Sequence, residues 1–353
     1  MNYRIEKGEK PAYLQLYEFL RQDITAGVFP FGSKLPSKRL MAEETGVSVI
    51  TVEHAYTILI EEGYIEARQR SGYRVIYREG DLLTTATTAP IRTPAHHAKT
   101  EFPYTVLAKT MRRVLTDYGE QILVKSPNRG CPELRSAIAA YLQRSNGIQV
   151  RPEQIIIGSG AEYLYSLIAQ LLDGHVFAAE EPCYDKILRV YRASGITVER
   201  LRLEANGIRS AELEQSNATV LHVTPFNSFP SGITADASKR AEYLRWAKKR
   251  SGYIIEDNYD SELTVSTKNE EPLFSKAKNV LYLNTFSKTV APSIRVGYLL
   301  LPEGLLVDFE QKLGFYSCTV PVFEQYVLAE LIANGDFERH INRVRRQKRK
   351  LVI

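Results

Sequence analysis

Lysine, aspartate and tyrosine side chains follow short apolar runs in the second half of the chain. Lys288 comes just after the run NVLYLNTFS, and Asp257 and Tyr259 close the run GYIIEDNY. A lysine at the end of a buried strand loses water, which favours the neutral amine and makes it a nucleophile for carbonyl carbons. A carboxylate buried at a strand end needs a cation beside it. These residues predict Schiff-base chemistry next to a positively charged group.

Other residues could hold a phosphate and a flat ring. The segment GSGAEYLYSL contains a glycine-flanked turn that opens a helix, and free N–H groups at a helix start bind phosphate. The candidates for holding the phosphate are Ser159, Gly160, Ala161, Ser287 and Arg295. Tyr184, in EEPCYDK, is an aromatic side chain that could cover a ring. Each feature also has a structural reading, as a solvated lysine, an ordinary turn or a packed tyrosine.

Together these parts match the needs of pyridoxal 5'-phosphate, a cofactor with an aldehyde, a pyridine ring and a phosphate. Lys288 would form the Schiff base and is the one catalytic candidate. Asp257 would keep the ring nitrogen protonated, and Tyr259 would donate a hydrogen bond to the phenolic oxygen. None of these residues indicates the cofactor alone. Their order along alternating strands and helices is what predicts a pyridoxal 5'-phosphate site.

The elements that would position these residues are strands alternating with helices. Strand-sized apolar runs recur along the chain, in QIIIGSG, HVFAAEEP, ATVLHVTP, GYIIEDNYD, NVLYLNTFSK and RVGYLLLP. Segments such as PELRSAIAAYLQRSNG, with proline in the first turn and Gly147 as the stop, have helical periodicity. This alternation predicts an α/β fold with an open, mainly parallel sheet that carries its chemistry at the strand ends.

Residues 1–78 have a different pattern, of three helices followed by a basic hairpin. The first helix is expected over 13–27, and Ser37 and Ser48 are expected to cap the second and third. Cations in the first turn of the second helix oppose its dipole, so a DNA phosphate is a candidate partner. The candidate DNA contacts are Ser37, Lys38, Arg39, Ser48, Val49, Thr51, Arg68 and Arg70. This pattern predicts a winged helix-turn-helix domain that binds double-stranded DNA. The alternative is a three-helix packing module with a solvated hairpin.

Composition distinguishes a linker from the body of the chain and indicates which kinds of partner and compartment to expect. Residues 79–101 are rich in threonine, alanine and proline, which predicts a linker before a body over 102–353. The net charge of +5, from 46 basic and 41 acidic residues, is too small to indicate nucleic acid by itself. The absence of a membrane-length apolar run or secretion signal, and three widely spaced cysteines, predict a cytoplasmic protein with no membrane partner. No metal site is expected, because His96-His97 has no ligand cluster around it.

The motifs in both parts resemble known families. LPSKRLMAEETGVSVITVEHAYTILIEEGYI resembles the GntR-type winged helix, and RGCPELRSAIAAYL, IIIGSGAEY, EEPCYDK, VTPFNSFPSG, EDNYD and TFSKTVAPSIRVGY resemble fold-type-I aminotransferases. Joined by a linker, the two parts resemble MocR/GabR-type transcription regulators. This resemblance implies a homodimer that holds promoter DNA and an aminotransferase-like body that binds pyridoxal phosphate. It gives the cofactor roles to Lys288, Asp257, Tyr259, Ser287, Arg295 and Tyr184.

The chain departs from that resemblance in three places. Val49 stands where GntR-type members commonly have arginine, and Phe226-Asn227-Ser228 replaces a usual Ser-His-Gln run. The chain ends in GDFERHINRVRRQKRKLVI, where the family continues into a small subdomain that carries an arginine for the substrate carboxylate. We therefore expect a C-terminally truncated body. The basic residues from Arg339 to Lys350 indicate either a nucleic-acid arm or a helix that lacks its partner face.

Three functional hypotheses follow. The first is a transcription regulator whose body senses an amine, an amino acid or the vitamer itself. The second is a working pyridoxal-phosphate-dependent aminotransferase with a DNA-binding head. The third is a truncated regulator that no longer binds the cofactor. We prefer the first hypothesis, in which any aminotransferase activity is vestigial.

Overall fold

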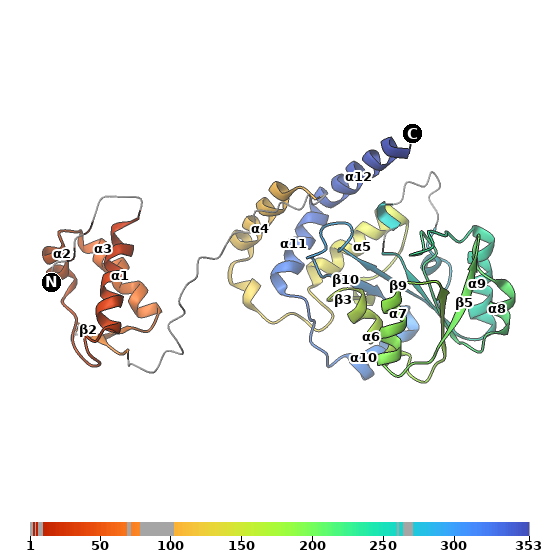
Figure 1. Ribbon diagram of the computed structural model, residues 1–353, viewed down its shortest axis with the longest axis horizontal. Helices are drawn as coiled ribbons and strands as arrows, with labels where there is room; N and C mark the ends of the chain where they lie inside the picture. The colour runs from red at the N-terminus through yellow and green to blue at the C-terminus, as the bar shows by residue number, and fades with distance from the viewer. Residues whose placement is uncertain are drawn as a thin grey trace. The chain divides into compact units, whose positions relative to one another are not determined.

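The computed structural model describes residues 3, 5, 10–68, 72–77, 102–259, 261–263 and 271–352. The chain divides into two compact units, Met1–Ala95 and His96–Ile353 (Figure 1). The division falls within the predicted linker 79–101, which lies outside the described residues, so the domain bounds 1–78 and 102–353 stay a prediction. No helix in the described ranges is long and apolar enough to cross a membrane.

The N-terminal unit is a three-helix domain with a two-stranded antiparallel hairpin. Its elements are α1 (Ala12–Thr25), α2 (Lys38–Thr45), α3 (Val49–Glu61), β1 (Ile65–Arg68) and β2 (Gly72–Val75). The side chains of Ser37 and Ser48 cap α2 and α3, accepting hydrogen bonds from the backbone N–H groups of Leu40 and Thr51. The turn between them uses Gly46 at φ +68°, a conformation that favours glycine. The predicted helix-turn-helix with a hairpin wing is therefore the observed arrangement.

An eight-stranded sheet forms the centre of the second unit, in the order β3-β10-β9-β8-β7-β4-β5-β6. Strands β9, β8, β7, β4 and β5 run parallel, while β10 is antiparallel to both of its neighbours and β6 is antiparallel to β5. The bounds are β3 Ile155–Gly158, β4 Phe177–Glu181, β5 Val198–Glu204, β6 Gly207–Ile208, β7 Val220–Val223, β8 Tyr253–Asp257, β9 Val280–Thr285 and β10 Gly297–Leu300. The mainly parallel sheet agrees with the sequence analysis.

Helices cover both faces of this sheet (Figure 1). Successive residues of a strand point to opposite faces, and in β10 Tyr298 and Leu300 join one apolar cluster while Leu299 joins another. Helices α4, α5, α11 and α12 contribute to the first cluster, and α6, α7 and α10 to the second. The helix bounds are α4 Tyr104–Tyr118, α5 Pro132–Asn146, α6 Ala161–Leu171, α7 Asp185–Ala193, α8 Ser210–Gln215, α9 Ala237–Lys249, α10 Leu306–Leu313, α11 Val322–Ala333 and α12 Asp336–Val352.

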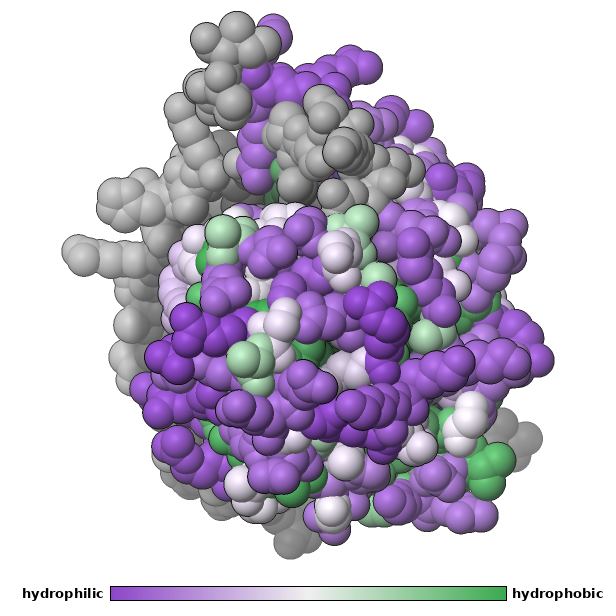
Figure 2. Space-filling view, turned by 90° about the vertical axis from the view of Figure 1, so that its right-hand side faces the viewer, coloured by the Kyte–Doolittle hydropathy of each residue, from purple (hydrophilic) through white to green (hydrophobic). Residues whose placement is uncertain are grey.

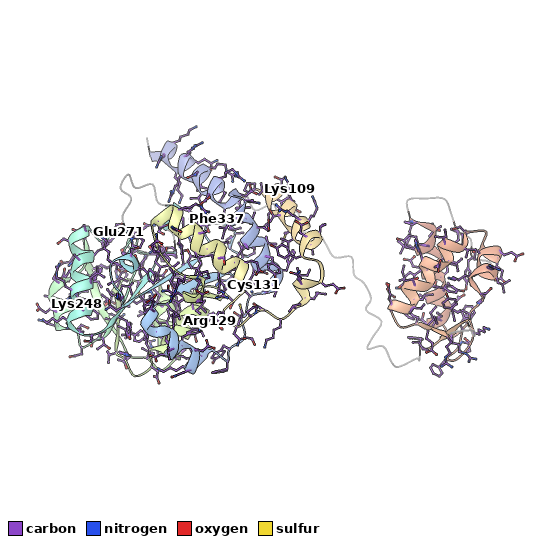
Figure 3. All side chains as sticks on the ribbon, turned by 180° about the vertical axis from the view of Figure 1, so that it is seen from behind. Lys109, Arg129, Cys131, Lys248, Glu271 and Phe337 are labelled. Carbon is purple, nitrogen blue, oxygen red and sulfur yellow. The ribbon has the colours of Figure 1, made fainter. Side chains whose placement is uncertain are left out.

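The basic helix at the end of the chain, α12, has a packed apolar face. Phe337, Ile341 and Val344 recur at helical spacing and are buried in the cluster on the α5 side of the sheet. Figure 3 shows Phe337 beside α5, where its ring lies edge-on to Tyr141 with centroids 5.2 Å apart. The expectation of a helix without a partner face is therefore wrong, because its first two turns already fill the core.

The end of this unit that carries α8 and α9 is hydrophilic. Figure 2 shows the side that carries α8 and α9, where polar and charged side chains predominate. Several of these come from the exposed face of α9, among them Lys248 and Lys249. The neighbouring strand β5 has alternating charged residues, which is why the sequence analysis, looking for continuous apolar runs, did not predict it.

Candidate functional site

A cavity of about 260 Å³ lies where the strands of the central sheet end. Asp257 is the last residue of β8 and Thr285 the last residue of β9, while α6 begins on the other side of the cavity. Seven of the nine predicted cofactor residues line it: Ala161, Tyr184, Asp257, Tyr259, Ser287, Lys288 and Arg295. Gly160 lies directly against Arg295, whereas Ser159 is not among the lining residues. The topology thus brings together residues that are far apart in sequence.

The start of α6 and Arg295 form a cradle for an anion. Gly160 precedes α6 with φ +94°, and a Cβ atom there would lie 2.7 Å from Nη2 of Arg295. Arg295 Nη1 donates to Ser287 Oγ at 3.3 Å, which joins two predicted phosphate ligands. Backbone N–H groups at a helix start and a guanidinium are suitable partners for a phosphate. The residues present therefore fit a phosphate group.

Glu162, in the first turn of α6, is an anionic neighbour that the sequence analysis missed. Its two carboxylate oxygens accept from Lys186 Nζ at 2.5 Å and from Arg295 Nη2 at 2.6 Å. Partial burial acts to raise the pKa of Glu162, but the hydrogen bond from Lys186 and the charge of Arg295 outweigh it and the pKa is lowered. An incoming phosphate would share Arg295 with this carboxylate.

Asp257 is buried at 2% exposure and is held by a chain of polar side chains. Its Oδ2 accepts a hydrogen bond from the Tyr165 hydroxyl and lies 3.5 Å from His222 Nε2. The other ring nitrogen of His222 lies 2.7 Å from the Tyr191 hydroxyl. Burial raises the pKa of both Tyr165 and Tyr191 well above the ordinary tyrosine value, so both keep their protons at neutral pH. His222 therefore lies between the Tyr191 hydroxyl and the Asp257 carboxylate, with one ring nitrogen near each.

The second oxygen of Asp257 has no hydrogen-bond partner among the described residues, although it is buried. An unpaired buried carboxylate oxygen is costly unless a donor reaches it. Asp257 lines the cavity, so a ligand in the cavity can supply that donor. A protonated pyridine nitrogen has the right chemistry, and Asp257 therefore fits the ring of the predicted cofactor.

Lys288 lies in the loop after β9 and is exposed. All six residues of β9 are buried, but the lysine comes three residues after the strand ends, where the chain reaches the cavity wall. The expectation that protein burial removes water from this amine is wrong. Because Lys288 lines the cavity, a ligand bound there would cover its amine.

The loop that contains Asn227 and Phe229 shapes the cavity near Tyr259 and Tyr184. The Tyr259 hydroxyl donates to the Asn227 carbonyl oxygen at 3.2 Å, and the Tyr184 ring lies edge-on to Phe229 with centroids 6.2 Å apart. Phe229 lines the cavity and was not predicted, although it directly follows the unusual Phe226-Asn227-Ser228 run. That loop is therefore part of the cavity wall.

A buried glutamate fixes this loop and gives a pH-dependence prediction. Glu180 Oε1 accepts from the Thr224 N–H at 3.1 Å and Oε2 from Ser228 Oγ at 2.6 Å. Burial raises the pKa of Glu180 from 4.5 to about 8. The folded chain then holds a proton that the unfolded chain has lost, so the free energy of unfolding should fall as pH rises from 4.5 to 8. Between the two pKa values, one such group changes the free energy of unfolding by about 1.4 kcal/mol per pH unit.

Glu180→Gln tests this expectation because the introduced amide keeps one acceptor and one donor without a charge. Urea unfolding between pH 5 and pH 8 should show a shallower decline for Glu180→Gln than for the wild type. Glu256, whose pKa burial raises to about 7, provides a second decline of the same sign and remains in both proteins. Identical pH profiles would mean that Glu180 is already ionised in the folded chain.

In the N-terminal unit the predicted DNA contacts take several roles. Lys38 Nζ lies 2.5 Å from Glu53 Oε1 of α3, so an internal carboxylate accounts for its position. Arg68 pairs with Glu66 at 2.6 Å, and Thr51 Oγ1 lies 2.8 Å from Ser48 Oγ. The exposed contacts are Ser37, Arg39, Ser48, Val49 and Arg68, while Arg70 lies outside the described residues.

The described residues contain no group of three or more histidine, cysteine, aspartate or glutamate side chains arranged to hold a metal ion. The cavity described above is lined by lysine, carboxylate, tyrosine and anion-binding groups.

Comparison with known proteins identifies relatives of both units. Residues 95–351 match the family model for aminotransferase class I and II, and residues 12–75 match that for bacterial regulatory proteins of the gntR family. The chain is 32% identical to the HTH-type transcriptional regulator YdeL of Bacillus subtilis, over 97% of this chain and 78% of YdeL. It is 29% identical to the probable rhizopine catabolism regulatory protein MocR of Rhizobium meliloti, over 96% of this chain and 75% of MocR.

A solved structure supports the fold of the second unit. An archaeal alanine:glyoxylate aminotransferase superposes with a TM-score of 0.63 at 26% identity, over 68% of this chain. The match spans 62% of the length of that enzyme, which is less than two thirds. The fold class and the pairing of a GntR-type head with an aminotransferase-like body, both predicted from the sequence, are confirmed.

Proposed function

The chain belongs to the aminotransferase class I and II family, with a gntR-family domain at its N-terminus, and we propose that it is a transcription regulator whose body binds pyridoxal 5'-phosphate and senses an amine. The observation that carries the cofactor assignment is the cavity in which seven predicted residues meet around an unpaired Asp257 oxygen. The head supports DNA as the partner, because a capped third helix of a winged helix-turn-helix domain is the element that enters a major groove.

Each cavity residue has a proposed task toward the cofactor. When bound, pyridoxal phosphate supplies an aldehyde that condenses with amines and a ring that withdraws electrons. Lys288 would contribute the amine that holds it, and Asp257 would accept a hydrogen bond from the ring nitrogen. Tyr259 would turn its hydroxyl proton from the Asn227 carbonyl oxygen to the phenolic oxygen, and Tyr184 would cover the ring. Ser287, Arg295 and the residues at the start of α6 (Ser159, Gly160 and Ala161) would hold the phosphate.

The proposed effector is a primary amine, an amino acid or the vitamer itself. An amine competes chemically with Lys288 for the same aldehyde, so its binding would change how the lysine and its loop are held. For regulation, the effector must favour one DNA-binding state over the other. A coupling free energy of about 1–3 kcal/mol would change DNA affinity by about 5- to 150-fold.

We also propose a homodimer. The stretch formed by α4 and η1 (Gly119–Leu123) leaves several large apolar side chains exposed, namely Tyr104, Leu115 and Leu123, followed by Val124. Exposed large apolar side chains that gather on neighbouring elements often mark protein interfaces. A second copy of the chain would cover it and would place two heads on one palindromic operator.

The proposal is tested by selecting double-stranded DNA from a random pool with the full chain. The affinity for the selected operator is then measured by fluorescence anisotropy with pyridoxal phosphate and a panel of amino acids and amines. We expect specific binding, and a change in the dissociation constant with at least one ligand.

Two results would contradict parts of this proposal. Failure to enrich any sequence would overturn the DNA-binding function. Cofactor binding with steady conversion of amino acid to oxo acid, and no effect on DNA affinity, would instead favour a working aminotransferase.

A further inference from the structure

Two branched apolar side chains stand exposed at the start of the third helix of the head. Val49 is 42% and Ile50 65% exposed, although they are adjacent and open α3. The opposite side of the same helix packs in the usual way, with Val52, Ala55, Tyr56 and Leu59 buried. A single exposed apolar residue needs no explanation. Two adjacent exposed apolar residues at the N-terminal end of a helix that is expected to meet base edges do need an explanation.

The first turn of α3 offers little else to a base. Its residues are Val49, Ile50, Thr51 and Val52, so this described turn contains no charged or amide side chain. The Thr51 hydroxyl lies 2.8 Å from Ser48 Oγ within the cap. One turn further, Glu53 is paired with Lys38. Hydrogen-bonding readout from this turn is therefore weak.

The turn is also held firmly in its orientation. The Ser48 side chain caps α3, and the Lys38–Glu53 pair ties α2 to α3. His54 lies edge-on to Tyr13 of α1, with ring centroids 5.7 Å apart. The apolar pair is thus presented by a helix fixed to both of its neighbours.

We infer that Val49 and Ile50 form a patch that reads the C5-methyl groups of thymines in the operator. In the major groove the thymine methyl is the apolar group on a base edge, and small apolar side chains recognise it. This inference rests on the proposed DNA-binding function and adds the chemistry of the bases. 5-Methylcytosine carries the same methyl, and the experiment below separates the two sources.

The test uses the operator selected by the full chain from unmethylated random DNA. Each thymine in the selected half-site is replaced in turn by uracil, which removes the methyl and keeps the pairing edge. At contacted positions we expect the affinity of the wild type to fall by about fourfold per methyl, the amount expected for one buried methyl-sized group. Val49→Ala and Ile50→Ala should each bind more weakly than the wild type and should lose less affinity when thymine is replaced by uracil.

Ile60→Ala is the matched control, since Ile60 is an isoleucine of α3 that is 38% exposed at the other end of the helix. It should keep the wild-type sensitivity to uracil. Circular dichroism checks folding, which alanine in an exposed helical position should not harm.

Each alternative result overturns the inference in a distinguishable way. Specific binding that uracil does not weaken would overturn the methyl-reading role and leave DNA binding intact. A second selection is made from the same pool after enzymatic cytosine methylation, and a sequence enriched only there would overturn the thymine assignment in favour of 5-methylcytosine. If neither pool yields an enriched sequence, the proposed function of the head fails together with this inference.

Discussion

Replacing Lys288 with alanine is expected to abolish covalent capture of pyridoxal phosphate by this chain. Lys288 is the one lysine among the described residues that line the cavity, and its amine is exposed to a ligand there. The wild type incubated with the cofactor and reduced with borohydride should gain the mass of the cofactor less one water plus two hydrogens, mapped by peptide mass spectrometry to the peptide that contains position 288. Lys288→Ala should gain none and should lack the visible absorbance band of the wild type.

Lys186→Ala is the matched control for this experiment. Lys186 also carries a primary amine near the cavity, with Nζ 5.8 Å from the centre of the Tyr184 ring, but it pairs with Glu162. Removing it should leave the label on Lys288. A label that persists in Lys288→Ala, or maps to Lys186, would contradict the assigned role, and no label in the wild type would remove the cofactor from the proposal.

Much of the fold follows from local sequence signals. The caps at Ser37 and Ser48 and the glycine turn at Gly46 are short-range features, so the head can be predicted residue by residue. The apolar strands of the sheet are buried on both faces and appear as continuous apolar runs. Strand β5 was missed because its pattern alternates with charge.

The candidate site was predictable only in part, because parallel strands bring distant residues to one edge. Apolar runs end at or just before Asp257, Tyr259 and Lys288, and this position allowed the three residues to be predicted from the sequence. Tyr165 and His222 are buried and contact Asp257 from α6 and β7, so only the three-dimensional arrangement shows their role. A signal did exist for His222, since it is a polar residue within the otherwise apolar strand β7.

Charge pairing was the least predictable feature of the chain. From the sequence, the position of Lys38 in the first turn of its helix was attributed to a DNA phosphate. In the structure the carboxylate of Glu53, fifteen residues later, accepts a hydrogen bond from the Lys38 amine. The phosphate candidates at the start of α6 gave no indication that Glu162 would bind Arg295. Partners of long flexible side chains depend on the packing of separate elements, which periodicity does not encode.

A methyl group at position 160 should strongly weaken cofactor binding. Gly160→Ala forces an L-residue into φ +94° and ψ 179°, a region that is essentially limited to glycine and costs on the order of 1–3 kcal/mol. Its Cβ would lie 2.7 Å from Arg295 Nη2, so the guanidinium must shift away from its observed position beside the start of α6. Losing a charge-assisted hydrogen bond to phosphate costs about 1.5–3 kcal/mol, so we expect affinity for pyridoxal phosphate to fall by about 10- to 100-fold in a fluorescence titration.

Gly174→Ala is the control that separates the contact of an added Cβ with Arg295 from the strain of placing alanine at a positive φ. Gly174 has a similar φ of +84°, but a Cβ there would meet nothing within 4 Å, so this variant should lose stability and keep its affinity. Arg295→Ala removes the guanidinium without straining the backbone and should weaken binding as Gly160→Ala does. Thermal melts show whether each variant is folded at the titration temperature. Wild-type affinity in a folded Gly160→Ala protein would mean that the phosphate does not lie between the start of α6 and Arg295, because the two cannot keep their observed contact around an added methyl group.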